Sequence, residues 1–154
     1  VVIDGDGLFA TAWSADGATP LLRSRGLPTV LTPHDGEYAL LTGDPPGDDR
    51  VTAARSLAAD TQCTVLLKGP TTVVSSPGGD VLVVDRGDQR LATAGSGDVL
   101  AGMVGAALAA GVPPLRAAAA AAWLHADAAR RGPPEGLLAG DIIELLPAAL
   151  AALR

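Results

Sequence analysis

The stretch AGSGDVLAG, residues 94–102, is a glycine-rich loop that ends in the carboxylate of Asp98 and runs directly into an apolar helix. Glycines let successive backbone N–H groups point into one concavity, and the N-terminus of the helix adds partial positive charge there. This geometry binds anions, above all phosphate. Beside a bound phosphate, Asp98 would be placed to take a proton from an attacking hydroxyl. The same residues also fit a simple turn with a helix cap, so the loop alone leaves both interpretations open.

The segments around this loop alternate between strands and helices. Continuous runs of Val, Leu, Ile and Thr are typical of strands buried inside a parallel sheet, and residues 77–80 (PGGD) predict a β-hairpin. Together they predict an α/β fold with a mainly parallel central sheet, helices on both faces and one hairpin at a mixed edge. The predicted strands are 1–4, 29–31, 64–68, 72–75 and 81–84, and the predicted helices are a short one ending near Gly43 and then 51–59, 98–110, 115–131 and 141–153.

Composition limits the classes of partner. The chain has 154 residues, the size of one domain, and it is 48% hydrophobic but only 3% aromatic, so Ala, Val and Leu must form the core. The net charge is −6, and Lys and Arg do not cluster beyond Arg130-Arg131. This balance argues against nucleic acid or an anionic membrane as a partner. An anionic small ligand must therefore be held locally, by backbone amides and a few cations.

Cysteine use and hydropathy suggest a cytoplasmic protein without a membrane span. The single cysteine, Cys63, cannot form an internal disulfide, which suits a reducing compartment. Residues 99–115 are uncharged and nearly long enough to cross a bilayer, but Gly111, Pro113 and Pro114 interrupt them. We therefore expect a buried helix followed by a turn.

Four loops rich in Gly or Pro follow predicted strands and carry polar side chains. They are residues 4–7 (DGDG), 32–37 (TPHDGE), 68–72 (KGPTT) and 95–98 (GSGD). In open α/β sheets, ligands bind beyond the carboxyl ends of the strands. We therefore expect these loops to line one rim, and this convergence is a stronger signal than any single motif.

Individual residues of these loops keep two interpretations each. Lys68 could meet a nucleotide phosphate, with the threonines after it adding hydrogen bonds, or it could extend into solvent at a strand end. His34 could bind a substrate hydroxyl or amide, or make one local hydrogen bond in a turn. Asp4 and Asp6 could hold a metal-bound phosphate or cap a helix, whereas His125 is interpreted as a packing residue of an Ala-rich helix. No His or Cys cluster has metal-ligand spacing, so we expect no protein-held metal.

Three motifs together resemble a known family. They are LTPHxGE at 31–37, VLLKG at 65–69 and ATAGSGDVLAG at 92–102, supported by VIDGDGL at 2–8 and AGDII at 139–143. In this order and at these intervals they resemble the ADP/ATP-dependent NAD(P)H-hydrate dehydratases, the carbohydrate-kinase-like domain of the YjeF family.

The resemblance implies a ribokinase-like fold and a repair activity. The family removes water from hydrated NADH or NADPH at the expense of ADP or ATP, with Mg²⁺ bound mainly to the phosphates. Family domains are much longer, so the resemblance implies that residues 1–154 form the C-terminal portion of a single domain whose N-terminal part is missing. We therefore expect a homo-oligomer or pairing with the missing segment.

The resemblance also assigns roles to residues of this sequence. Asp98 would be the catalytic base and a substrate contact, and His34 would contact the hydrated dinucleotide. The anion hole would comprise Gly95, Ser96 and Gly97, and the nucleotide would be bound by Lys68, Gly69, Pro70, Thr71, Thr72 and Gly97.

Three departures from the family pattern leave alternatives open. Ser96 stands where the family usually has Thr, Asp35 where it usually has Pro, and KGPTT at 68–72 where KGAGT is usual. A carboxylate at position 35 could weaken binding of a phosphate-bearing substrate. The alternatives are a small-molecule kinase of the same superfamily, acting on a sugar or a vitamin alcohol, and an inactive nucleotide-binding fragment.

Overall fold

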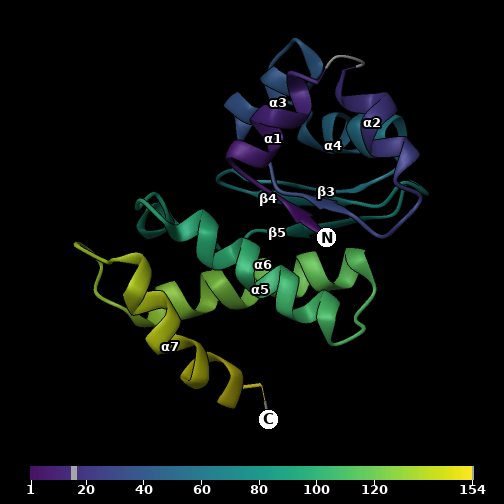
Figure 1. Cartoon of the computed structure of the whole chain (residues 1–154). Helices are drawn as coiled ribbons and strands as arrows, with labels where there is room; N and C mark the ends of the chain where they lie inside the picture. The colour runs from purple at the N-terminus through teal and green to yellow at the C-terminus, as the bar shows by residue number, and fades with distance from the viewer. Residues whose placement is uncertain (15–16, 154) are drawn as a thin grey trace.

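Five strands form one mixed sheet in the computed structural model, which describes residues 1–14 and 17–153 (Figure 1). The strand order is β1-β2-β3-β4-β5; the first three strands are parallel, and β4 is antiparallel to both of its neighbours. The strands are β1 (Val2–Ile3), β2 (Val30–Leu31), β3 (Thr64–Leu67), β4 (Thr72–Ser75) and β5 (Val81–Val84). The helices are α1 (Asp6–Ala12), α2 (Ala18–Ser24), α3 (Asp35–Thr42), α4 (Arg50–Thr61), α5 (Ser96–Ala109), α6 (Pro114–Arg131) and α7 (Ala139–Ala151), with a 3-10 turn at Gln89–Leu91.

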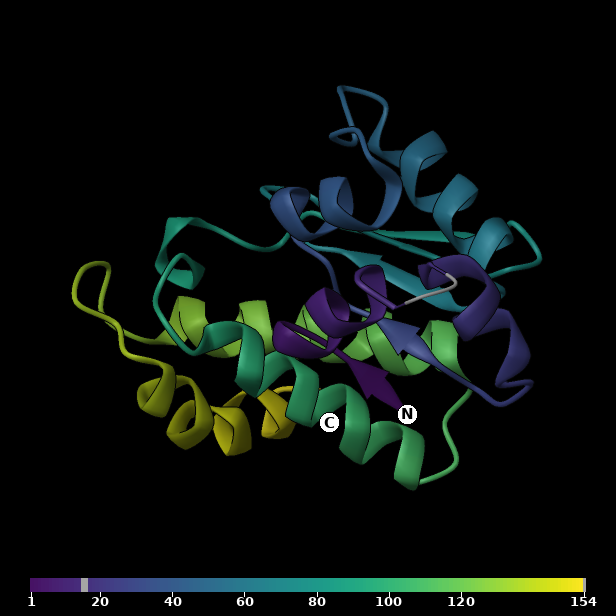
Figure 2. The same cartoon turned by 45° about the horizontal axis from the view of Figure 1, so that its top comes forward.

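Successive side chains along a strand point to opposite faces of the sheet, so the core is divided between the two faces. Val65 and Leu67 of β3 pack on one face with residues of α1 to α4, whereas Leu66 between them packs on the other face with residues of α5 and α6. All three side chains are fully buried, which explains the continuous apolar run of β3. Figures 1 and 2 show α1 to α4 on one side of the sheet and α5 to α7 on the other.

The helices on the second face pack closely because their contact residues are small. Ala118, Ala121 and Ala122 of α6 are buried against Leu100 and Val104 of α5 and the sheet. Further along, α6 packs against α7 through a separate cluster that includes Ala128, Ala129 and Ile142. This packing accounts for a core with almost no aromatic residues.

Helix ends follow the local chemistry of the sequence. The His34 side chain caps α3, Glu37 completes the capping box, and Gly43 ends the helix with a φ of 94°. The Asp49 side chain accepts a hydrogen bond from the N–H of Thr52 and so caps α4. The His34 cap lies at the pocket described below, and the Asp49 cap directly precedes Arg50.

The predicted α/β class, with helices on both faces, is confirmed. All five predicted strands and the four longer helices are found, with ends shifted by two residues or fewer. Three features go beyond the listed elements: β3 also pairs antiparallel with β4, with Val65 opposite Ser75, and two short helices form, α1 over residues 6–12 and α2 over residues 18–24. Four strands nevertheless run in the same direction, so their carboxyl ends share one edge.

No helix in the described part of the chain is long and apolar enough to cross a membrane. Gly111 ends the apolar segment with a φ of 83°, and Pro114 then opens α6 at its first position, which agrees with the turn expected there.

Candidate active site

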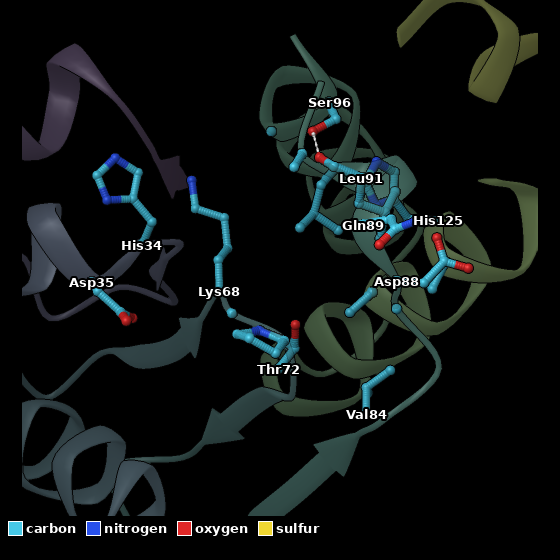
Figure 3. A pocket seen from close by; sticks show the side chains of 18 of the residues that line it. His34, Asp35, Lys68, Thr72, Val84, Asp88, Gln89, Leu91, Ser96 and His125 are labelled. Carbon is cyan, nitrogen blue, oxygen red and sulfur yellow. Dashed lines mark hydrogen bonds between the residues drawn. The ribbon is translucent and has the colours of Figure 1, made fainter. Parts of the chain in front are cut away.

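A pocket of about 830 Å³ lies at the carboxyl edge of the sheet, between the α3 side and the α5–α6 side (Figure 3). Figure 3 shows His34, Asp35 and Lys68 on one side of the space and Ser96, Leu91 and His125 on the other. The predicted site residues among those that line the pocket are His34, Lys68, Gly69, Pro70, Thr72, Ser96 and Gly97. Three of the four predicted loops therefore meet here, whereas Thr71, Gly95 and Asp98 are not among the lining residues.

Lys68 is held between two carboxylates. Its Nζ lies 2.8 Å from Asp4 Oδ1 and 3.4 Å from Glu37 Oε2, and all three side chains are about four-fifths buried or more. Asp4 Oδ1 also accepts a hydrogen bond of 2.7 Å from the Thr32 hydroxyl. Lys68 therefore does not extend freely into solvent. Its ammonium is held at the pocket by contacts that connect the ends of β1, β2 and β3.

Asp4 and Asp6 have different surroundings. Asp4 makes the ion pair with Lys68, and α1 begins after Gly5 without a side-chain cap, so capping does not explain Asp4. Asp6 lies exposed in the first turn of α1. Asp4 thus contacts Lys68, which lines the pocket, although Asp4 itself is not among the lining residues.

The His34 side chain makes the local hydrogen bonds expected of a turn residue and also lines the pocket. Its Nδ1 accepts hydrogen bonds from the N–H groups of Gly36 and Glu37, at 3.0 and 3.2 Å. A neutral imidazole that accepts at Nδ1 carries its proton on Nε2. The side chain is 59% exposed, and it lines the pocket, so a ligand can reach the Nε2–H donor.

The glycine-rich loop begins α5 beside Lys68. Gly95 has a φ of 84° and precedes the first turn, and the Ser96 hydroxyl donates a hydrogen bond of 2.6 Å to the Leu91 carbonyl. A Cβ atom placed on Gly97 would lie 3.6 Å from both Asp4 Oδ2 and Lys68 Nζ. The positive end of α5 and the Lys68 ammonium therefore face one small space.

The N–H groups of this loop are not equally free. The Ser96 N–H donates to the Thr93 carbonyl at 3.2 Å, whereas those of Gly97 and Asp98 have no partner within the described residues. The donors available to an anion are thus the second and third N–H groups of α5. The Asp98 side chain is exposed in that same first turn.

His125 is a pocket residue that the sequence interpretation undervalued. It is 4% exposed, lines the pocket from α6, and its Nε2 is buried without a hydrogen-bond partner. Burial lowers the pKa of His125 to about 4, so the ring is neutral at physiological pH. Ala122 and Ala126 line the pocket on the same face of α6, and the spacing 122, 125, 126 was the available signal.

Two further residues were not identified from the sequence. Glu37 accepts the backbone N–H of His34 at 2.8 Å and also pairs with Lys68. Arg50, at the start of α4, contacts both Asp35 and the Lys68 carbonyl. Each joins segments that lie far apart in the sequence, which is why no local motif marks it.

The family model for NAD(P)H-hydrate dehydratase matches residues 1–147 of this chain. The chain belongs to this family. The bifunctional NAD(P)H-hydrate repair enzyme of Mycobacterium leprae is 53% identical over 129 residues, which cover 84% of this chain and 26% of that protein. The ADP-dependent (S)-NAD(P)H-hydrate dehydratase of Neisseria meningitidis is 44% identical over 150 residues, covering 92% of this chain and 50% of that protein.

Solved structures agree with the family assignment. The ADP/ATP-dependent NAD(P)H-hydrate dehydratase of Bacillus subtilis, co-crystallised with ATP and Mg²⁺, has a TM-score of 0.78 and 33% identity, covering 82% of this chain and 48% of that one. A hydroxyethylthiazole kinase of Pyrococcus horikoshii has a TM-score of 0.73 and 25% identity, covering 97% and 59%. The resemblance and the ribokinase-like fold are thereby confirmed. The chain spans half or less of the length of the curated relatives that it matches.

Proposed function

We propose that the protein containing this chain removes water from hydrated NADH or NADPH and uses ADP or ATP as the phosphoryl donor. Membership of the dehydratase family supports this function over a sugar or vitamin-alcohol kinase. The observation that carries the proposal is the placement of Gly97 beside Lys68, because N–H donors and an ammonium there face one space suited to phosphate.

The rest of the pocket suits the two ligands. Its wall includes the apolar side chains of Val84, Leu91 and Leu100, which can cover a purine base. His34 lies on the other side of the space and offers an Nε2–H donor to the hydrated dinucleotide. A volume of about 830 Å³ is in the range of small-molecule sites.

The chemistry solves a leaving-group problem. Hydroxide leaves poorly, so the substrate hydroxyl oxygen first attacks the terminal phosphorus of the nucleotide and gives its proton to a base. The carbon–oxygen bond then breaks with phosphate as the leaving group, and a proton is lost from the neighbouring carbon. This elimination restores the ring double bond of the nicotinamide.

Individual roles follow within this proposal. Asp98 acts as the base at the substrate hydroxyl, Gly95 and Gly97 belong to the anion hole, and residues 68–72 bind the nucleotide. Ser96, expected in the anion hole from the sequence, does not donate there, because its N–H bonds to the Thr93 carbonyl and its hydroxyl to the Leu91 carbonyl. In the part of the chain that the structure describes, no three His, Cys, Asp or Glu side chains form a metal site. Mg²⁺ would therefore be held mainly through the phosphates, where it neutralises their charge.

We further propose that residues 1–154 belong to one ribokinase-like domain as its C-terminal portion. The matched residues make up 50% of the Neisseria meningitidis dehydratase and 48% of the Bacillus subtilis structure, which supports a larger domain around the described sheet. Contacts with that remaining portion, or with a second copy of the chain, would then complete the substrate side of the pocket.

The test is recovery of NADH fluorescence from hydrated NADH in the presence of ADP or ATP, measured on the full-length protein. We expect recovery only with nucleotide, and we expect Asp98→Asn to reduce turnover by about 10²-fold or more, the contribution of a positioned base. Asp141→Asn is the matched control. Asp141 is the third residue of α7, as Asp98 is of α5, and its carboxylate accepts a hydrogen bond from the Leu138 N–H.

The other outcomes separate the alternatives. Formation of ADP from ATP with an alcohol, without NADH, would identify a superfamily kinase. Nucleotide binding by the full-length protein without any turnover would indicate an inactive nucleotide-binding protein. Turnover that survives Asp98→Asn would remove Asp98 from its proposed role.

A further inference from the structure

Arg50 connects two loops of the pocket, the one after β2 that carries His34 and the one after β3 that carries Lys68 (the two ligand loops), without lining the pocket itself. Its Nη1 lies 2.8 Å from Asp35 Oδ1 in the loop after β2, and its Nη2 donates a 2.7 Å hydrogen bond to the carbonyl of Lys68 after β3. The Arg50 side chain is 18% exposed and is not among the pocket-lining residues. Its guanidinium therefore holds the loops without occupying the ligand space.

The guanidinium also lies directly against Gly69. A Cβ atom at position 69 would come within 2.5 Å of Arg50 Nη2 and 2.9 Å of its Cζ. Arg50 Nε is buried and has no hydrogen-bond partner in the described structure. An ion pair with the exposed Asp35 contributes little to stability, so it does not explain why the guanidinium packs against Gly69 with its Nε buried and unpaired.

The contact with the Lys68 carbonyl fixes the direction of the next N–H group. All peptide bonds described are trans, so the C=O of Lys68 and the N–H of Gly69 point in opposite directions. Since the carbonyl points at Arg50, the Gly69 N–H points away from it, and Gly69 lines the pocket. That N–H has no acceptor among residues 1–14 and 17–153.

We propose that Arg50 is a positioning residue, which orients the Lys68–Gly69 peptide so that the Gly69 N–H can donate to a nucleotide phosphate. Asp35 keeps Arg50 in place and so links the His34 loop to the nucleotide loop. The proposal rests on the proposed function for its ligand, an adenosine diphosphate or triphosphate. It also gives Asp35 a use at a position where the family usually has Pro.

The first test is ADP affinity by isothermal titration calorimetry on the full-length protein. Arg50→Ala should weaken ADP binding about tenfold, the effect of losing one well-oriented hydrogen bond to a charged group. Arg50→Lys should not restore affinity, since one ammonium cannot bond to both Asp35 and the Lys68 carbonyl. Asp35→Asn should have a smaller effect, about threefold, because that ion pair is exposed.

Arg55→Ala is the matched control. Arg55 lies on the same helix, and its Nε donates to a backbone carbonyl, that of Gly79, at 3.0 Å. Gly79 belongs to the β4–β5 turn and does not line the pocket. This variant should bind ADP like the unmodified protein, and equal unfolding midpoints of the two variants would exclude a general loss of structure.

A double-substitution cycle gives the sharper test. Gly69→Ala must displace the guanidinium, so it should weaken ADP binding about as much as Arg50→Ala, and the double variant should be no weaker than either. In steady-state turnover the KM for ADP should rise while kcat at saturating ADP changes little. Additive losses, or unchanged ADP affinity in Arg50→Ala, would overturn the proposal.

These results are separable from the proposed function. ADP binding that depends on Arg50, without any recovery of NADH, would keep the positioning role and reject the dehydratase. Recovery of NADH together with unchanged ADP affinity in Arg50→Ala would keep the dehydratase and reject the positioning role. A protein that binds neither ADP nor ATP would contradict both.

Discussion

Gly97→Ala should separate ligand binding from folding. The added Cβ would lie 3.6 Å from Asp4 Oδ2 and from Lys68 Nζ, which are ordinary contact distances, and Gly97 does not have a positive φ. The folded chain can therefore accept the methyl group. Replacing glycine by alanine within a helix stabilises it by up to about 1 kcal/mol, so the free energy of unfolding should be unchanged or slightly higher.

The same methyl group should damage the phosphate site. It would fill the space between the first turn of α5 and the Lys68 ammonium, where the phosphate would approach the Gly97 N–H. Loss of one charge-assisted hydrogen bond costs about 1.5–3 kcal/mol, which corresponds to a decrease in affinity of about 10- to 150-fold. Calorimetry with ADP measures the affinity, and urea unfolding measures the stability.

Gly102→Ala is the matched control on the same helix. A Cβ atom at position 102 meets nothing within 4 Å, and the residue is exposed. This variant should show the same small gain in stability and an unchanged affinity for ADP. Wild-type affinity in Gly97→Ala would refute the placement of phosphate at this N–H, and a loss of more than about 1 kcal/mol in stability would refute the steric argument.

Three further predictions concern stability. Burial lowers the pKa of His125 to about 4, so below about pH 6.5 the unfolded chain takes up a proton that the folded chain does not. The free energy of unfolding, measured with urea, should therefore fall by about 2 kcal/mol between pH 7 and pH 5, and the His125→Leu variant should lack this decrease. Leu66→Ala should lower the free energy of unfolding by about 2–5 kcal/mol, because its side chain is fully buried in the second core; a loss below about 1 kcal/mol in urea unfolding would contradict that packing. Lys68→Met should destabilise the protein by about 2–3 kcal/mol, since it leaves Asp4 and Glu37 partly buried without their cation; a calorimetric melt that Lys68→Met leaves unchanged would contradict the ion pairs.

The sequence was sufficient for most of the fold because its strong local signals agree with the global arrangement. The strand at 64–67 is buried, with a continuous apolar run at 65–67, and the turn around Gly79 has the chemistry of a hairpin. The segment at 18–24 lacks such a signal, since it is only seven residues long and contains Pro20, and α2 was not predicted. The extra pairing of β3 with β4 depends on the conformation of the short KGPTT connection rather than on either strand.

For the site, the sequence predicted which loops meet but not which side chains hold them together. The rule that ligand loops follow the carboxyl ends of strands brought His34, Lys68 and Gly97 together correctly. The side chains that hold them were not predictable, because Lys68 pairs with Asp4 across 64 residues and Arg50 reaches the Lys68 carbonyl across 18. Only the folded sheet brings such partners together. The roles assigned to all of these residues remain predictions, and Asp98, Gly95 and Thr71 do not line the pocket.

The charge balance explains why glycine positions should matter so much here. Around the two ligand loops, the carboxylates of Asp4, Asp35 and Glu37 face only two cations, Lys68 and Arg50, so this group carries a net charge of −1. These five side chains therefore give no net attraction for a phosphate, and the 154 residues together carry −6. Affinity must come from short-range donors, namely the Lys68 ammonium and the backbone N–H groups on the loop after β3 and at the start of α5. Substitutions that block or misdirect those donors should consequently weaken binding more than the removal of Asp35, an exposed charge at the rim.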